Sequence, residues 1–285
     1  MLKSLRNLCE VSGHSSILPS LSFSCNSHVN DARKPFKSGG SCGDTFTTEA
    51  EELPLYPRGL VEIREYTLKP EGVGAYTQLA IEYAAVRKTL LPLLGIFSCD
   101  VGSSLHRITH MYHYKDFDER DAVRAAAAKH PDWRKFIELS RPHVQFQENK
   151  VMLEAGPVYD ALKLPHCSLF QSPPPDPKAI YELRSYQMHP GHGVVPNLVE
   201  AFQSGLPAKI ASYPEGKLVF FGYSDVGMLN NVVELWRFPS AQSCIRARQA
   251  SRKVAAWGAT MKAVTPNVLH FTSSFLRPLP FSPWL

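Results

Sequence analysis

The chain has 285 residues, a formal net charge of +5 and a hydrophobic fraction of 44%, which is ordinary for one or two globular domains. Its basic residues are scattered, so composition gives no support for nucleic-acid binding, and no apolar stretch is long enough to span a membrane as a helix. The six cysteines form no CxxC pair. This excludes a disulfide framework and a zinc-finger pattern, and it favours a reducing compartment.

Residues 1–57 do not have the pattern of a folded domain. The first thirty residues contain eight serines and one acid, Glu10, and leucines at helical spacing flank Lys3 and Arg6. This combination is typical of a mitochondrial transit peptide. The sequence therefore predicts a mitochondrial protein, in the matrix or associated with a membrane. The alternative is a cytosolic protein whose N-terminal tail merely lacks acids.

A strand pattern near residue 60 occurs a second time 120 residues later. The matching segments are VEIREYTLKP (61–70) with YELRSYQMHP (181–190), DVG (100–102) with DVG (225–227), and LHRITHMYHY (105–114) with LNNVVELWRF (229–238). Such internal similarity indicates two divergent copies of one unit of about a hundred residues. The resulting division is a transit-like segment 1–57, a first repeat 58–154, a Pro-rich linker 155–178, a second repeat 179–276 and a Pro-rich tail 277–285.

The first repeat predicts a strand, a helix, two strands joined by a hairpin, a helical region and a final strand. The expected elements are a strand over 61–70, a helix after the turn at 70–74, strands over 95–101 and 105–114, a helix capped by Asp116 or Asp118 and interrupted at Pro131, and a strand over 144–153. The order βαββαβ is that of a ferredoxin-like unit, with both helices on one face of an antiparallel sheet. The second repeat follows the same plan.

Each sheet of this kind leaves one face uncovered. Two units on one chain can bury both faces by pairing, so we expect an α+β fold in which two βαββαβ repeats form a pseudo-twofold α/β barrel. We expect the linker, which contains three consecutive prolines from Pro173, to be stiff and extended, and the tail after residue 276 to be irregular.

Strand periodicity divides the side chains into two sets. Val61 and Ile63 share one face of the first strand, whereas Glu62, Arg64 and Tyr66 share the other. Since apolar sets most simply contact helices, we expect the polar sets to line the space between the two sheets. The candidate residues for this inter-sheet cavity are Glu62, Arg64, Tyr66, His106, His110, Tyr112, Glu182, Arg184 and Tyr186.

Two interpretations of these enclosed charges are open. Charged groups away from water are costly unless they are paired, so the Glu and Arg residues can serve to fix strand register. This interpretation is favoured because both repeats carry them. Alternatively they surround a small anionic or aromatic ligand. Arg124 and Arg248, at matching helical positions, are expected on solvated faces, and Trp133 and Trp257 in the core.

No catalytic residue, metal ligand or cofactor is predicted. Motifs for nucleotide binding, nucleophilic serine chemistry and zinc hydrolysis do not occur in the sequence. His106, His110 and His113 are close in sequence, but on a strand His113 points away from the other two. The second repeat has no matching set of histidines, so we do not expect a metal site.

Residues 58–276 resemble the NIPSNAP family. The resemblance rests on the repeated strand, on the Val-Gly hairpin and on the segment L-[NH]-x-[VI]-x-x-[LM]-[WY]-x-[YF]. The resemblance implies a dimeric α/β-barrel fold, mitochondrial targeting in animals, and roles in vesicular traffic and in marking damaged mitochondria through autophagy adaptors. It implies no catalytic residues. The family pattern favours Asn followed by His in the third strand, whereas this chain has His106 and His110 in one repeat and Asn230 and Glu234 in the other.

We therefore predict a non-enzymatic mitochondrial protein that acts through protein partners, namely trafficking proteins or autophagy adaptors, with self-association as a further expectation. The alternative is a small-molecule-binding or monooxygenase-like protein that uses the cavity between the two sheets, an argument from fold analogy alone.

Overall fold

The computed structural model describes residues 56–285, which lie in one compact unit, Glu52–Leu285. The predicted transit-like character of residues 1–57 falls almost entirely outside the described residues. Within residues 56–285, no helix combines the length and the apolar character needed to cross a membrane.

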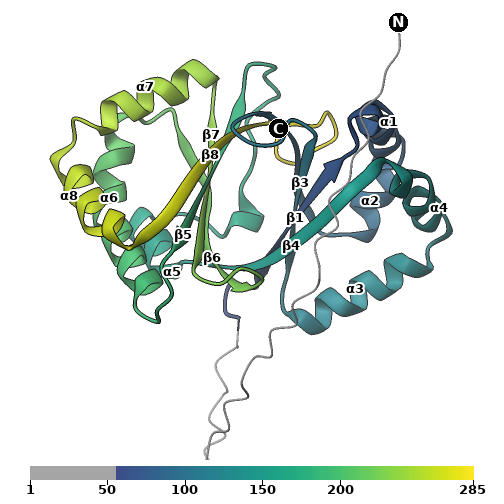
Figure 1. The fold of residues 1–285 in the computed structure, drawn as a ribbon, viewed down its shortest axis with the longest axis horizontal. Coiled ribbons are helices and arrows are strands. Elements are labelled where there is room, and N and C mark those ends of the chain that lie inside the picture. The colour runs from purple at the N-terminus through teal and green to yellow at the C-terminus, as the bar shows by residue number, and fades with distance from the viewer. Residues whose placement is uncertain (1–55) are drawn as a thin grey trace, which may run out of the picture. The chain divides into compact units, whose positions relative to one another are not determined.

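The two halves of this unit repeat one order of strands and helices (Figure 1). The first half consists of β1 (Leu60–Leu68), α1 (Val73–Glu82), α2 (Ala84–Leu90), β2 (Leu93–Val101), β3 (Arg107–Tyr114), α3 (Phe117–Lys129), α4 (Pro131–Ser140) and β4 (Val144–Glu154). After α5 (Gly156–Leu162), the second half consists of β5 (Ile180–Met188), α6 (Val194–Ser212), β6 (Lys217–Val226), β7 (Asn231–Phe238), α7 (Ala241–Ser251), α8 (Ala255–Val264) and β8 (Val268–Pro278).

The eight strands form a closed antiparallel barrel in the order β1-β3-β2-β8-β5-β7-β6-β4. Each half contributes the ferredoxin-like order, and the pairs β2–β8 and β4–β6 join the halves. Helices α1–α4 cover the strands of the first half, and α6–α8 cover those of the second, on the opposite side of the barrel (Figure 1). The predicted α+β barrel of two βαββαβ repeats is confirmed.

Local sequence signals explain where the helices of the first half begin and end. The Asp116 carboxylate accepts a hydrogen bond from the Glu119 backbone N–H at 2.8 Å, which caps the start of α3. Pro131 follows the end of α3 and occupies the first turn of α4, where its missing N–H leaves no hydrogen bond unmade. The predicted cap and the predicted interruption are both observed.

The interior of the barrel is filled with apolar side chains from both halves. Val61 and Ile63 point inward and pack with fully buried residues that include Phe97, Tyr181 and Phe220. An eight-stranded barrel is just wide enough for its own side chains to fill. The prediction that Val61 and Ile63 contact the helices was therefore wrong. Tyr181 and Leu183, the matching residues of the second repeat, belong to the same inner cluster.

The polar sets lie on the outer face of the barrel, beneath the helices. In the register of β1 with β3, Arg64 lies opposite His110 and Glu62 lies opposite Tyr112, so these residues share a face as predicted. Glu62, however, is bonded by Arg120 and Arg124 of α3, which places that face against the helices. The carboxylate lies there because the helices supply the guanidinium groups that a buried charge requires.

The segments after each half are more ordered than expected. The predicted extended linker contains α5, whose Val158 and Tyr159 are buried against α6, so that prediction was wrong for this part. Strand β8 continues through Pro278, beyond the expected end of the regular structure. Trp284 joins the apolar core inside the barrel, and the Leu285 carbonyl accepts a hydrogen bond from Arg237 at 2.8 Å.

Candidate ligand pockets between the sheet and the helices

Two pockets occupy equivalent places in the two halves, each between the strands and their covering helices. The first pocket, of about 330 Å³, is lined by Arg64 and Tyr112 from the strands and by Trp133 from α4. The second pocket, of about 310 Å³, is lined by the matching residues Arg184, Trp236 and Trp257. The fold thus presents one pocket framework twice.

Arg87 of α2 is the deepest cation of the first pocket. Arg87 is 3% exposed, and its Nη1 donates a hydrogen bond to the Tyr112 hydroxyl at 2.6 Å. Its guanidinium carbon lies 5.0 Å from the ring centroids of both Trp133 and Phe136. Within residues 56–285, no carboxylate forms an ion pair with Arg87, so hydroxyl and aromatic groups alone surround the charge.

Arg64 also has no acidic partner among the described residues. Its guanidinium carbon lies 5.5 Å from the Tyr66 ring, and its Nε is buried without a hydrogen bond. Glu62, two residues earlier on β1, is instead occupied by Arg120 at 2.9 Å, Arg124 at 3.1 Å and Asn149 at 2.8 Å. The first pocket therefore contains two guanidinium groups whose charge is not met by a carboxylate.

His110 lies behind the first pocket and does not contribute a charge to it. Its Nδ1 is 3.4 Å from the Arg64 carbonyl, to which it donates, and this leaves Nε2 to accept from the Tyr76 hydroxyl at 3.3 Å. Burial lowers the pKa of His110 well below its usual range, and the charges of Arg87 and Arg64 lower it further. The imidazole is therefore neutral at physiological pH.

The second pocket has a different balance of charge because Glu234 occupies the position of His110. Glu234 accepts from the Tyr186 hydroxyl at 2.6 Å, the Trp236 indole at 2.5 Å and the Lys209 ammonium at 3.4 Å. Arg184 forms an ion pair with Glu182 at 2.9 Å. Two buried carboxylates, Glu182 and Glu234, therefore pair with cations of the second pocket, whereas Arg252, which also lines it, has no ion pair among residues 56–285.

Glu182 is the centre of a further ion-pair cluster beside the second pocket. It accepts from Arg248 of α7 at 2.6 Å and from Ser273 of β8 at 2.9 Å. Burial by itself raises the pKa of Glu182, but Arg184, Arg248 and a hydrogen bond from Cys244 outweigh it and lower the pKa to about 2. Arg124 and Arg248 thus pair with buried carboxylates, and the expectation of solvated faces was wrong.

The structure brings together only some of the residues predicted for one inter-sheet cavity. Arg64, Tyr66 and Tyr112 line the first pocket, and Glu182 and Arg184 line the second. Glu62, His110 and Tyr186 are buried beside these pockets and act as hydrogen-bond partners. His106 is half-buried in the turn before β3 and lines neither pocket.

Sequence reasoning did not identify Arg87 and Lys209 as pocket residues. Both lie in the helical region between the first two strands of their repeat, Arg87 on α2 and Lys209 on α6. Lys209 lies 4.4 Å from the Trp257 ring centroid, and Arg87 lies 5.0 Å from that of Trp133. Their signal in the sequence is a cation near the end of a largely apolar helix, and in the first repeat Lys88 follows that cation directly. That signal is weak because such a cation is usually solvated.

The space between the two sheets, where the cavity was predicted, is largely the packed barrel core. A small cleft of about 160 Å³ remains, lined in part by Glu65, Arg107 and Lys150. Arg107 and Glu65 form an ion pair at 3.3 Å, and Lys150 donates to Asn231 at 3.0 Å. The cleft has about half the volume of either outer pocket, and its main charged groups are already paired, although Arg107 Nε has no hydrogen-bond partner, so it is a weaker candidate.

One cluster has the residue types of a metal site: Glu154, His166 and Cys167, whose potential ligand atoms lie within 4.8 Å of one another. The Cys167 backbone N–H donates to Glu154 at 2.7 Å, and His166 Nδ1 accepts from the Ser168 N–H at 3.2 Å. A neutral imidazole that accepts at Nδ1 carries its proton on Nε2, which faces the Arg58 carbonyl. Hydrogen bonds thus occupy both ring nitrogens of His166, whereas the buried Glu154 Oε2 has no hydrogen-bond partner.

Comparison with known proteins decides the family. The NIPSNAP family model matches residues 61–156 and 181–283. The chain belongs to the NIPSNAP family. Human NipSnap homolog 3A is 27% identical over 223 residues, which cover 78% of this chain and 84% of that protein. Mouse NipSnap homolog 3B is 26% identical over the same shares of the two chains.

Solved structures outside the close family share the NIPSNAP barrel fold. A candidate monooxygenase from Lactobacillus acidophilus superposes with a TM-score of 0.53 at 10% identity, covering 77% of this chain and 93% of its own. A candidate monooxygenase from Fusobacterium nucleatum has a TM-score of 0.54 at 8% identity. At such low identity the likeness extends to the fold and not to the chemistry.

Proposed function

We propose that this NIPSNAP protein binds a small organic molecule in the pockets between its sheets and helices. The observation that carries the proposal is that pockets of about 330 and 310 Å³ recur at equivalent places in the two halves. These volumes fall at the lower end of the range of small-molecule sites, and aromatic walls with a few polar groups are typical of such sites.

The proposal is tested with the full-length protein by native mass spectrometry and by thermal shift against a panel of small metabolites. Ala128 lines the first pocket, whereas the exposed Ala126 on the same helix lines neither pocket. We expect Ala128→Phe to abolish ligand-dependent stabilisation and Ala126→Phe to preserve it. Absence of any bound compound and of any thermal shift would contradict the proposal. Oxygen uptake with the bound compound tests for monooxygenase-like turnover.

A second candidate function is that this protein acts in mitochondria by binding protein partners. Its role would be in vesicular traffic or in marking damaged mitochondria for autophagy. Membership of the NIPSNAP family supports this function, because these are the roles that the resemblance to the family implies. One structural feature also favours it: five apolar side chains at the β2–β3 and β6–β7 turns, all at one end of the barrel, are between 49% and 67% exposed. They are Val101, Leu105, Val226, Met228 and Leu229. Exposed apolar surface of this kind often marks protein contacts.

The partner function is tested in two steps. A fluorescent fusion of residues 1–57 is expected to enter mitochondria, and a diffuse cytosolic signal would contradict the localisation. Affinity capture from depolarised cells is expected to recover autophagy adaptors or trafficking proteins with the wild type. The double variant Leu105→Ser/Leu229→Ser is expected to lose them, and equal recovery with both proteins would remove the barrel end from the proposal.

A further inference from the structure

We infer that the first pocket selects an organic anion, namely a carboxylate on a small aromatic body, and that the second pocket does not. The inference rests on the proposed small-molecule function and specifies its ligand class and its location. It depends on the charges of the two pockets, which differ although their frameworks match.

The first pocket has an excess of positive charge that cannot be relieved by deprotonation. Arg64 and Arg87 both line it, and neither forms an ion pair with a carboxylate of residues 56–285. An arginine remains charged at all physiological pH values, so its burial is costly until an anion or strong dipoles compensate it. The buried Arg64 Nε, which has no hydrogen-bond partner, is a donor available to such an anion.

The surroundings of the two arginines provide no internal counterion. His110 is neutral, and Tyr112 and Tyr76 offer only hydroxyl groups. Burial is the largest cause of the raised pKa of Tyr76, so its phenolate does not form near neutral pH. Only hydroxyl dipoles and aromatic rings of the protein compensate the two arginines, which leaves both able to pair with the carboxylate of a bound molecule.

The walls of the pocket indicate the rest of the ligand. Tyr66, Trp133 and Phe136 line it, and the Trp133 and Phe136 rings are stacked at 5.1 Å. Aromatic surfaces favour a flat apolar body, while the planar guanidinium fork matches the geometry of a carboxylate. A volume of about 330 Å³ admits a small ring acid.

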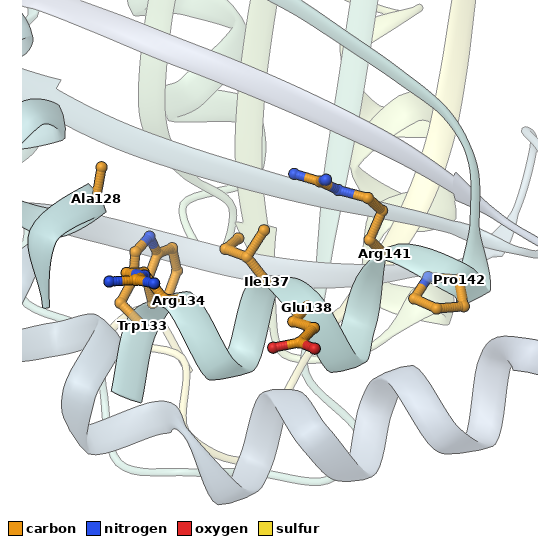
Figure 2. A pocket seen from close by; sticks show the side chains of 7 residues that line it. All are labelled: Ala128, Trp133, Arg134, Ile137, Glu138, Arg141 and Pro142. Atoms are coloured by element: carbon orange, nitrogen blue, oxygen red, sulfur yellow. The ribbon is translucent and has the colours of Figure 1, made fainter. Parts of the chain in front are cut away.

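An outer groove of about 660 Å³ adjoins the first pocket. Figure 2 shows the side chains that line this groove. The groove and the pocket share Ala128, Trp133, Ile137 and Arg141. In Figure 2, Arg141 projects from the end of α4, and Trp133 lies at the start of the same helix. Two guanidinium groups, those of Arg134 and Arg141, and one carboxylate, that of Glu138, line this groove, so its net charge is positive and attracts an anion.

The second pocket also has more cations than carboxylates, since Arg252 lines it as well, but it differs in having buried carboxylates beside its cations. Glu234 and Glu182 together pair with Arg184, Lys209 and Arg248. An added carboxylate there would meet two buried carboxylates and displace existing hydrogen bonds. The exchange of His110 for Glu234, together with the pairing of Arg184 with Glu182, is therefore the difference that predicts one anion site per chain.

The test is isothermal titration calorimetry of the full chain with 1-naphthoate and with its neutral counterpart 1-naphthamide. We expect one naphthoate per chain and at least about tenfold tighter binding than for the amide, since a charge-assisted pair contributes about this factor. Arg64→Gln is expected to weaken naphthoate binding about tenfold. Arg246→Gln, which removes the same charge from an exposed position on α7, is expected to leave it unchanged.

A second variant locates the site. His110→Glu places a carboxylate behind the first pocket, as Glu234 does behind the second, and it is expected to abolish naphthoate binding. If this variant does not fold, as judged by circular dichroism, Arg64→Gln still decides the question because Arg64 is only half-buried.

Equal affinities for naphthoate and naphthamide, or equal effects of Arg64→Gln and Arg246→Gln, would overturn the inference. Failure of naphthoate to bind at millimolar concentration would overturn it as well. A neutral compound found bound to the purified protein would in that case leave the broader small-molecule proposal standing.

Discussion

His110 and Glu234 occupy the same place in the two halves of the barrel, each directly opposite an arginine on the neighbouring strand. His110 pairs with Arg64 between β3 and β1, and Glu234 pairs with Arg184 between β7 and β5. One exchange of residue type therefore changes the charge of a whole pocket while the backbone around it is repeated. The predictions below test this relationship and the packing that supports it.

We predict that His110 makes the protein less stable in mild acid. Its folded pKa is lowered by burial and by Arg87 and Arg64, so the unfolded chain binds the proton more readily than the folded chain. The free energy of unfolding should be constant above the unfolded pKa of about 6.5 and fall as pH decreases below it. Urea unfolding between pH 5 and 8 measures this, and His110→Gln should flatten the slope. An unchanged slope in the variant would assign the effect to another group.

Glu182 should contribute strongly to stability through its ion pairs. Because its pKa is lowered to about 2, its contribution is present above pH 4.5 and is lost as pH falls toward 2. We expect Glu182→Gln to lower the free energy of unfolding by roughly 3 kcal/mol at pH 7, from the shift of the buried carboxyl. The exposed Glu200 of α6 provides the control, since Glu200→Gln should change stability by less than about 0.5 kcal/mol.

Two helical glycines should respond in opposite directions to replacement by alanine. A Cβ at Gly205 of α6 would lie 2.0 Å from the Thr260 hydroxyl of α8, whereas a Cβ at Gly258 would meet nothing within 4 Å. We expect Gly205→Ala to cost about 1–3 kcal/mol through overpacking. Gly258→Ala should stabilise the protein by up to about 1 kcal/mol, because alanine favours the helix. Thermal unfolding of both variants checks the pair, and equal shifts would contradict close contact of α6 with α8.

The C-terminal tail should act as part of the barrel core. Trp284 is 3% exposed and packs inside the barrel, so Trp284→Ala should lower the free energy of unfolding by about 3–5 kcal/mol. Leu169, which is 66% exposed, is the matched control, and Leu169→Ala should have a small effect. Chemical unfolding measures both variants. A tail that contributes nothing would give Trp284→Ala the stability of the wild type.

The repeat, the strands and the closed barrel were predictable from the sequence because they depend on local patterns that occur twice. The period of two also showed which side chains share a face, as the pairing of Arg64 with His110 confirms. It did not show which face points inward. Alternation is the same from either side of a sheet, and the prediction that Glu62 and Arg64 face the space between the sheets was wrong.

The sequence by itself determined the family, the two ferredoxin-like units and the membership of each strand face. Only the tertiary structure decided that the apolar face fills the barrel and that the polar face lies beneath the helices. A small closed barrel has room for apolar side chains but provides few partners for charges, whereas α3 and α7 bring arginines to Glu62 and Glu182. The helices likewise bring Arg87 and Lys209 to the two pockets, an arrangement that no local pattern encodes.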